Sequence, residues 1–301
     1  NDLDKGVIKR NPSSTCKSGP GGVDSLGRWQ KLELRQLANQ SFYMINKNGR
    51  IRTHFKHQVR PDAEILKDND ALGLPGLIIQ KESRCIRDPL VVDIHYQLTQ
   101  INRTLKEDFH LDGLDGKGKT TIGVAYGASS GEFIPPQYLS FNYYDEKSDL
   151  PKSADISLVA REFAFGVIYH SSKLELNKVE SGALAYAFAD IFGLYMKMKI
   201  SPGKEKYMLG EFLKNNSVEN RPIKNFAAPP SGEVLHKSDI YTVLNDSNAW
   251  IVRKVFYHLA EGHIGLEASA KIFFKAMISL PKNATFKDAK IHTVRSVKKE
   301  F

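Results

Sequence analysis

The chain has 301 residues, of which 41% are hydrophobic and 26% are charged, and its formal net charge at pH 7 is +9. This composition predicts a soluble globular protein with room for one large or two ordinary domains. The longest apolar stretch, residues 182–196, is too short to span a membrane and contains Asp190, so we expect a core helix and no transmembrane segment.

The positive charge favours anionic neighbours, and residues 282–301 contribute six Lys or Arg against two acids. The charge is otherwise dispersed and no nucleic-acid motif is present, so we expect weak attraction to anionic surfaces and no nucleic acid partner. Cys16 and Cys85 are compatible with one disulfide in an oxidising compartment. The chain starts at Asn1 without Met, which we interpret as a processed product that is secreted, extracellular or periplasmic.

The N-terminal part is predicted to be rich in strands. After a polar arm over residues 1–18, residues 42–57 (FYMINKNGRIRTHFKH) have the pattern of a hairpin in which Asn48-Gly49 forms the tight turn. His54 and His57 form an H-x-x-H pair on this hairpin. They point to opposite faces of a strand without an accompanying carboxylate or thiol, so we predict a solvated surface pair and no metal site.

Helical patterns follow further along the chain. Residues 93–108 have helical apolar spacing, and the glycines of LDGLDGKG after them form turns, because the spacing of a phosphate-binding loop is absent. Two apolar helices joined by a polar turn are predicted over residues 157–170 and 180–199, and two core helices over residues 248–262 and 266–280. We predict an α+β fold with a β-rich N-terminal lobe containing one long helix at residues 1–154, and a helical C-terminal lobe at residues 155–301.

Several of these segments together resemble the thermolysin-like (M4) metallopeptidases. The helix at 180–199 contains ESGA at its start and DIFG at 190–193, which is the pattern of the family's second zinc-binding helix. Further similar segments are GPGG at 19–22, DIHY at 93–96, the LDGLDGKG turn and NAWIVRKVFYHL at 248–259. The resemblance implies a two-lobed fold with the former active-site cleft between the lobes.

The residues that perform the family's chemistry are replaced in this chain. The family motif HExxH presents two histidines to one Zn²⁺ and uses its glutamate as general base, but the matching residues here are Arg161, Glu162 and Phe165. Tyr186 stands where the second helix supplies its glutamate ligand, four residues before Asp190. Arg161 has no acceptor atom, Phe165 has no lone pair, and Tyr186 could bind only as a phenolate. We therefore expect no zinc, and without zinc Glu162 has no activated water.

Three further family positions can be compared, and two of them differ. Asp246 aligns with the histidine that stabilises the tetrahedral intermediate, where an acid would repel an oxyanion. Arg221 aligns with the family's carbonyl-binding arginine. Residues 131–136 (GEFIPP) match the strand that pairs with extended substrates, but two prolines remove backbone donors from it.

The calcium-binding positions of the family are altered as well. They correspond to Ser157, Lys197 and residues 206–208, and only Glu211 is retained. Because hard cations need several oxygen ligands, we expect the double calcium site to be absent.

The sequence therefore predicts a secreted thermolysin-like pseudopeptidase without zinc or proteolytic activity. It would act by binding a protein or glycan partner, as a decoy, an inhibitor, an adhesin or a toxin-associated subunit. Two alternatives stay open: a divergent M4 peptidase with residual or relocated hydrolase activity, for instance through Glu162 and Tyr186, and a purely structural subunit. We also hypothesise that Arg161 faces Glu162, Asp246 or the Tyr186 ring and fills the old cleft.

Overall fold

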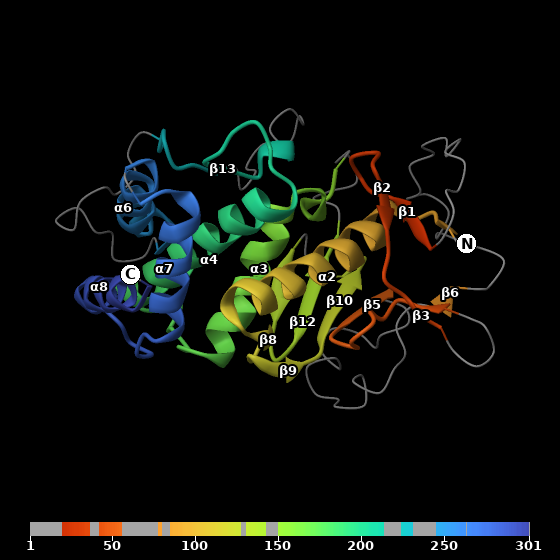
Figure 1. Ribbon diagram of the computed structural model, residues 1–301, viewed down its shortest axis with the longest axis horizontal. Coiled ribbons are helices and arrows are strands. Elements are labelled where there is room, and N and C mark those ends of the chain that lie inside the picture. Colours follow the sequence, from red (N-terminus) through yellow and green to blue (C-terminus); the bar gives the residue numbers. More distant parts are fainter. Residues whose placement is uncertain are drawn as a thin grey trace.

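The computed structural model describes residues 20–36, 42–55, 78–79, 85–127, 131–142, 150–213, 224–230, 245–262 and 264–300. Strands dominate before residue 155 and helices after it (Figure 1). The strands are β1 (Gly21–Val23), β2 (Trp29–Lys31), β3 (Arg35–Gln36), β4 (Phe42–Tyr43), β5 (Ile51–Phe55), β6 (Ile78–Ile79), β7 (Cys85–Ile86), β8 (Asp112–Gly113), β9 (Lys117–Lys119), β10 (Thr121–Ala125), β11 (Glu132–Ile134), β12 (Tyr138–Phe141), β13 (Met208–Leu209) and β14 (Lys224–Asn225). The helices are α2 (Pro89–Phe109), η3 (Lys152–Ala154), α3 (Ile156–His170), α4 (Val179–Ile200), η4 (Glu211–Leu213), α5 (Asn245–Asn248), α6 (Trp250–Glu261), α7 (Leu266–Ile278) and α8 (Phe286–Glu300).

The main sheet of the N-terminal region has the strand order β11-β12-β10-β5. β10 pairs in parallel with both β5 and β12, while β11 pairs antiparallel with β12 and forms one edge of the sheet. Helix α2 packs on β5 and β10 with a stripe of fully buried residues that includes Leu90, Ile94 and Leu98. The α2 helix begins at Asp88, whose carboxylate accepts a hydrogen bond from the backbone of Val91 at 3.1 Å.

The predicted hairpin is only partly formed. Gly49 has a φ of 76° and permits the expected turn, and Ile45 and Arg52 form an isolated antiparallel bridge. However, β4 pairs with β3 and β6, whereas β5 joins the main sheet. The prediction of a solvated His54 is wrong: its residue is 1% exposed, because β5 lies beside β10 and His54 is paired with Val124. His57 lies outside the described residues.

Helices α3 and α4 form the centre of the C-terminal region and match the predicted helices to within a residue or so at each end. Asp155 caps α3 by accepting a hydrogen bond from the Ser157 backbone at 2.9 Å. Both helices are apolar on most sides because the other helices and the main sheet surround them. Gly193 lets α4 cross α3 closely: a Cβ there would lie 2.4 Å from the Ser157 carbonyl oxygen.

The remaining helices cover α4. α4 packs against α5, α6, α7 and α8, and the predicted helix at 248–262 begins later, at Trp250, after the short helix α5. Helix α8 was not among the predicted helices, because its sequence is polar and basic and its apolar stripe is narrow. Within the described residues, no helix has both the length and the apolar character needed to cross a membrane.

Candidate functional site

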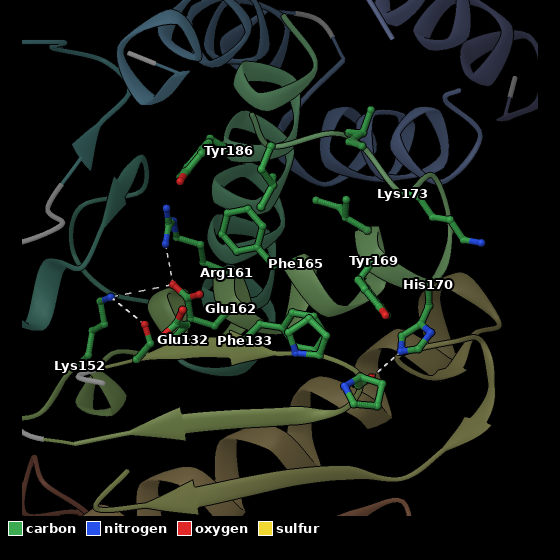
Figure 2. Close-up of a pocket in the computed structure, with 16 residues that line it drawn as sticks. Glu132, Phe133, Lys152, Arg161, Glu162, Phe165, Tyr169, His170, Lys173 and Tyr186 are labelled. Atoms are coloured by element: carbon green, nitrogen blue, oxygen red, sulfur yellow. Dashed lines mark hydrogen bonds and ion pairs between the residues drawn. The ribbon is translucent and has the colours of Figure 1, made fainter. Parts of the chain in front are cut away.

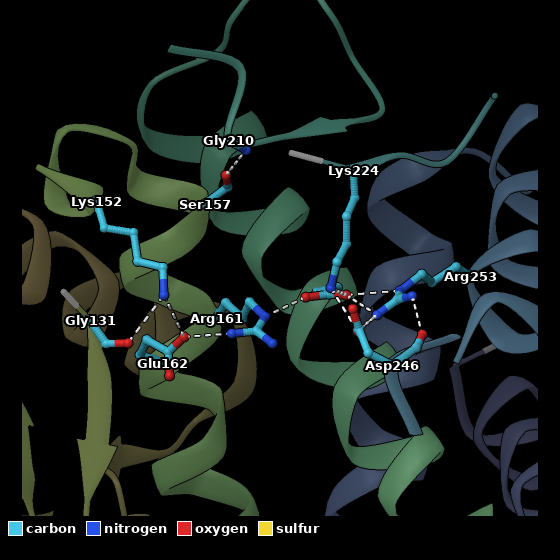
Figure 3. A network of polar contacts seen from close by, with 10 residues as sticks. Gly131, Lys152, Ser157, Arg161, Glu162, Gly210, Lys224, Asp246 and Arg253 are labelled. Atoms are coloured by element: carbon cyan, nitrogen blue, oxygen red, sulfur yellow. Dashed lines mark hydrogen bonds and ion pairs between the residues drawn. The ribbon is translucent and has the colours of Figure 1, made fainter. Parts of the chain in front are cut away.

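Five of the predicted site residues lie together where α3 faces α4. Arg161 is at the centre: its Nε donates to Asp190 Oδ1 at 2.7 Å and its Nη1 donates to Glu162 Oε1 at 2.6 Å (Figure 3). The guanidinium carbon lies 5.1 Å from the ring centroid of Phe165 and 5.5 Å from that of Tyr186, and the two rings meet edge to face. Burial lowers the pKa of Arg161, but the carboxylates of Glu162 and Asp190 outweigh burial and raise that pKa above its ordinary value. Arg161 is therefore a permanent cation at this position.

Asp190 is a fully buried carboxylate shared by three cations. Besides Arg161, Lys224 Nζ donates to Asp190 Oδ2 at 2.9 Å and Arg253 Nε donates to the same oxygen at 2.8 Å. Burial raises the pKa of Asp190, but the nearby charges of Lys224, Arg253 and Arg161 dominate and hold that pKa well below its usual range. Asp190 is thus ionised, and it ties α3, α6 and β14 to α4.

Asp246 lies at the outer end of the same network. Its side chain is 50% exposed, and its Oδ1 accepts a hydrogen bond from Lys224 at 2.8 Å and another from Arg253 Nη2. Arg253 also donates through Nη1 to the Asp246 carbonyl oxygen at 2.7 Å and lies over the Trp250 ring. The attraction of Arg253 and Lys224 lowers the pKa of Asp246 although burial opposes it. Direct polar contacts of Asp246 with the described residues run to Lys224 and Arg253; its effect on Arg161 is a longer-range attraction.

Glu162 lies between Arg161 and a second cation, Lys152. Lys152 Nζ is 4.0 Å from Glu162 Oε1 and donates to the Gly131 carbonyl oxygen at 3.2 Å (Figure 3). Burial, and to a lesser degree the charge of Arg161, lowers the pKa of Lys152, while Glu162 opposes this shift. The Glu162 carboxylate is accordingly held by two cations.

An open pocket of about 950 Å³ lies beside this cluster. It is bounded by β11, by one side of α3, by the turn after α3 and by α4 (Figure 2). Its apolar wall includes Phe133, Phe165 and two unusually exposed side chains, Tyr169 at 46% and Leu176 at 47%. Its polar end is formed by Lys152, Arg161, Glu162 and Tyr186, with His170 and Lys173 at the opposite end. The pocket therefore offers an apolar surface with charges at both ends.

The edge of the sheet that faces this pocket is partly blocked. Lys152 donates a hydrogen bond to the carbonyl oxygen of Gly131, just before β11, so a partner strand cannot use that oxygen freely. Pro135 and Pro136 follow β11. Proline has no N–H to donate, and a lysine at a strand edge opposes pairing with another strand. Addition of a peptide strand at β11 is therefore limited to its few remaining backbone groups.

The donor atoms at the α3–α4 crossing do not fit Zn²⁺. Arg161 presents only N–H donors, and Phe165 presents carbon. The Tyr186 hydroxyl is the one side-chain oxygen among Arg161, Phe165 and Tyr186. The ring of Tyr186 contacts Arg161 and Phe165. A zinc site needs about three protein ligands with free lone pairs. Over the described residues, no group of three or more His, Cys, Asp or Glu side chains is placed to hold a metal ion.

The other predicted positions are only partly described. Arg221 and Cys16 lie outside the described residues, and nothing is described of the Cys85 side chain, so neither the arginine's contacts nor the disulfide is seen. Lys197 pairs with Glu211 at the end of α4 remote from the pocket, and Ser157 accepts a hydrogen bond from the neighbouring Gly210.

Three important residues, Lys152, Lys224 and Arg253, were absent from the predicted site. Arg253 had a usable signal, because it falls three residues from both Trp250 and Phe256 and so on the buried side of an apolar helix. A charged residue in such a position needs a buried partner. Lys152 and Lys224 lie outside the predicted helices, where the sequence contains no comparable signal.

Known proteins share this architecture. Residues 172–301 match the sequence pattern of the family described as "Thermolysin metallopeptidase, alpha-helical domain". A zinc metalloproteinase of Listeria monocytogenes is 26% identical over 270 residues, which cover 84% of this chain and 49% of that protein. An extracellular elastase of Staphylococcus epidermidis is 23% identical over 214 residues, which cover 66% of this chain and 40% of that protein. The chain thus spans about half or less of the length of these relatives.

A solved structure also resembles the chain. The precursor of protealysin, a metalloproteinase from Serratia proteamaculans, superimposes with a TM-score of 0.63 at 18% sequence identity. The superposition covers 83% of this chain and 82% of the protealysin precursor chain. The fold, with its strand-containing N-terminal region and helical C-terminal region, is therefore that of the thermolysin-like metallopeptidases. The chain is similar to the M4 metallopeptidases in sequence over residues 172–301 and shares their fold.

Proposed function

We propose that this chain is a thermolysin-like pseudopeptidase that binds a partner in its pocket and does not cleave peptides through zinc. The observation that supports the proposal most directly is the position of Arg161. Its guanidinium lies between Glu162 and Asp190 at 2.6 and 2.7 Å and against the rings of Phe165 and Tyr186. By the sequence resemblance, Arg161, Phe165 and Tyr186 stand where the family has its zinc ligands, and Glu162 stands where it has its general base.

The alternative of a relocated hydrolase has less support. A general base must reach the proton that it removes, and a nucleophile should lie beside that base. Glu162 instead accepts a hydrogen bond from Arg161 and lies near Lys152, so its carboxylate is committed to two cations. The contacts of Tyr186 that the structure gives are ring contacts with Arg161 and Phe165.

The pocket supports a binding role. Exposed aromatic and aliphatic side chains such as Tyr169 and Leu176 are candidates for an interaction surface when they line one hollow. The chemistry of the walls favours a protein partner that inserts apolar side chains, and a glycan stacked on Tyr169 is the competing occupant. Because two of the similar proteins are extracellular elastases of Staphylococcus epidermidis, we propose that this chain also acts outside the cell.

Zinc content tests the absence of the metal site. Purified protein is loaded with excess Zn²⁺, dialysed and analysed for metal, beside a variant with Arg161→His, Phe165→His and Tyr186→Glu that restores the ligand set. The wild type is expected to retain less than about a tenth of an equivalent, and the folded triple variant about one equivalent. Circular dichroism checks that the triple variant is folded.

Either of two results would contradict the proposal. A full equivalent of zinc in the wild type would mean that other residues ligate the metal, and peptide hydrolysis would then have to be assayed again. A folded triple variant that takes up no zinc would mean that these three positions do not correspond to a zinc site. For the binding role, Tyr169→Ala and Leu176→Ala should each weaken partner binding, and Val255→Ala, an exposed apolar residue of α6, is the matched control.

A further inference from the structure

The ammonium group of Lys197 is enclosed at the end of α4, away from the pocket. The Lys197 residue is only 2% exposed. Its Nζ donates to the carbonyl oxygens of Glu205 and Met208, both at 2.8 Å, and forms an ion pair with Glu211 Oε2 at 2.5 Å. All three oxygens come from the chain that follows α4, here called the 203–213 segment.

The number of partners matches the chemistry of an ammonium group. A lysine ammonium has three N–H donors, and the 203–213 segment supplies three oxygens to it. Ca²⁺ takes about six to eight oxygen ligands at about 2.3–2.6 Å, and Mg²⁺ requires a near-octahedral set. Three oxygens with a lysine nitrogen at their centre therefore suit the ammonium and do not suit a divalent cation.

The oxygens are held in place by further contacts. Glu211 Oε1 accepts hydrogen bonds from the backbone N–H groups of Lys204 at 2.8 Å and Glu205 at 3.1 Å. The Glu211 carboxylate packs directly against Gly203, because a Cβ at that position would lie 1.9 Å from Glu211 Oε2. Burial would raise the pKa of Glu211, but the ion pair with Lys197 and the hydrogen bonds from the backbone outweigh it, so the pKa is lowered and the carboxylate stays charged.

The segment is also anchored to the start of α3. The backbone N–H of Gly210 donates to Ser157 Oγ at 2.9 Å (Figure 3), and that of Phe212 donates to Asp155 Oδ2 at 3.0 Å. Asp155 in turn caps α3 through Ser157. The Lys197 group therefore lies within a folded loop that packs directly against α3.

We propose that the Lys197 ammonium is a built-in cation that organises the 203–213 segment without a bound divalent metal. The segment then needs no calcium, in contrast to the double calcium site that the family resemblance implies for this part of the chain. The inference stands on the Lys197 contacts alone and is independent of the state of Arg161 and of the pocket.

The test measures thermal unfolding and limited proteolysis in EDTA and in 10 mM CaCl₂, an excess over about 10⁻⁴–10⁻³ M, the range of weak extracellular calcium sites. We compare the wild type with Lys197→Met, Lys197→Glu and the control Lys199→Met, which removes an ammonium that lies on the same helix but is more exposed and pairs with Glu267. The wild-type melting temperature should be the same in both buffers to within about 1 °C, since nothing divalent is bound.

The variants are expected to separate from the control. In Lys197→Met, protease cleavage inside the 203–213 segment, located by mass spectrometry, should be at least about tenfold faster than in Lys199→Met, because the Glu211 carboxylate, whose side chain is only 12% exposed, has lost its partner. Lys197→Glu places a second carboxylate among the same oxygens, so Ca²⁺ should raise its melting temperature by about 2–4 °C. If Lys197→Met does not fold, Gly203→Ala gives the same comparison, because the added methyl displaces Glu211 and keeps every charge.

Three results would overturn the inference. The first is a wild-type melting temperature that rises with Ca²⁺ or falls in EDTA by several degrees. The second is cleavage of the 203–213 segment in Lys197→Met and Gly203→Ala at the rate seen in Lys199→Met. The third is a folded Lys197→Glu variant that does not respond to Ca²⁺. None of them bears on zinc content, so failure here and failure of the proposed function are distinguishable.

Discussion

Asp190 is the residue on which the buried polar network depends, and Asp190→Asn tests that dependence. The substitution keeps the size of the side chain and removes the charge that Arg161, Lys224 and Arg253 share. Removing one partner of a buried ion pair costs about 3–5 kcal/mol. Arg161 keeps Glu162, and the other two cations keep Asp246, so the lower end, about 3 kcal/mol, is expected.

This free energy converts into a measurable change in melting temperature. The entropy of unfolding is about 2.1 cal/mol/K per residue, or about 0.63 kcal/mol/K for the 301 residues of the chain. A loss of about 3 kcal/mol then lowers the melting temperature by about 5 °C at pH 7. Calorimetry measures this change. Glu267→Gln is the control, because its side chain is 48% exposed and such surface pairs contribute less than about 1 kcal/mol.

The pH dependence provides a second measurement on the same variant. The cations hold the pKa of Asp190 below its ordinary value, so its contribution to stability is present above the unfolded-state pKa of about 3.9 and is lost as the pH falls through the folded-state pKa. The difference between wild type and Asp190→Asn should therefore shrink between about pH 4 and pH 2. The reasoning is refuted if Asp190→Asn melts within about 1 °C of the wild type at pH 7.

Further predictions follow from other buried contacts. Arg253→Met should destabilise the protein by about 3 kcal/mol, and its effect should not add to that of Asp190→Asn, which a double-mutant cycle by calorimetry measures. Gly193→Ala should cost about 1–3 kcal/mol in urea unfolding, because its Cβ would lie 2.4 Å from the Ser157 oxygen; an unchanged midpoint would contradict the close crossing of the helices. Burial lowers the pKa of His54 to about 4, so stability should fall as the pH drops from about 6.5 to 4, and His54→Gln should lack part of that fall; identical pH profiles would contradict the burial of His54.

Much of the fold was predictable because its signals are local. The apolar spacing of 157–170 and 180–199 gave both central helices. Helix α2 is four residues longer than predicted at its N-terminus, where Asp88 supplies the cap, and one residue longer at its C-terminus. His54 was mispredicted because the lack of a metal site was taken to mean a solvated histidine, although a strand that joins the main sheet can bury one without a metal. The narrow apolar stripe of α8 explains why that helix was not predicted.

The site was less predictable because its contacts join distant parts of the chain. The contacts of Arg161 with Glu162 and Tyr186 were hypothesised from the family resemblance, but its pairing with Asp190 was not. Lys224 and Arg253 reach Asp190 across 34 and 63 residues of sequence, and only the tertiary fold brings them together. Whether these positions have lost a catalytic role is a question for the zinc measurement.

The Lys197 ammonium is covalently attached to the chain, and this affects how the stability of the 203–213 segment depends on the solution. A dissociable metal ion stabilises a protein by an amount that grows with the logarithm of its free concentration, so its effect varies between compartments and disappears with a chelator. A covalently attached cation is always present at one equivalent. The folding equilibrium of the 203–213 segment is therefore set by the chain alone, and the ionic composition of the surroundings affects it only through weak screening of a buried pair.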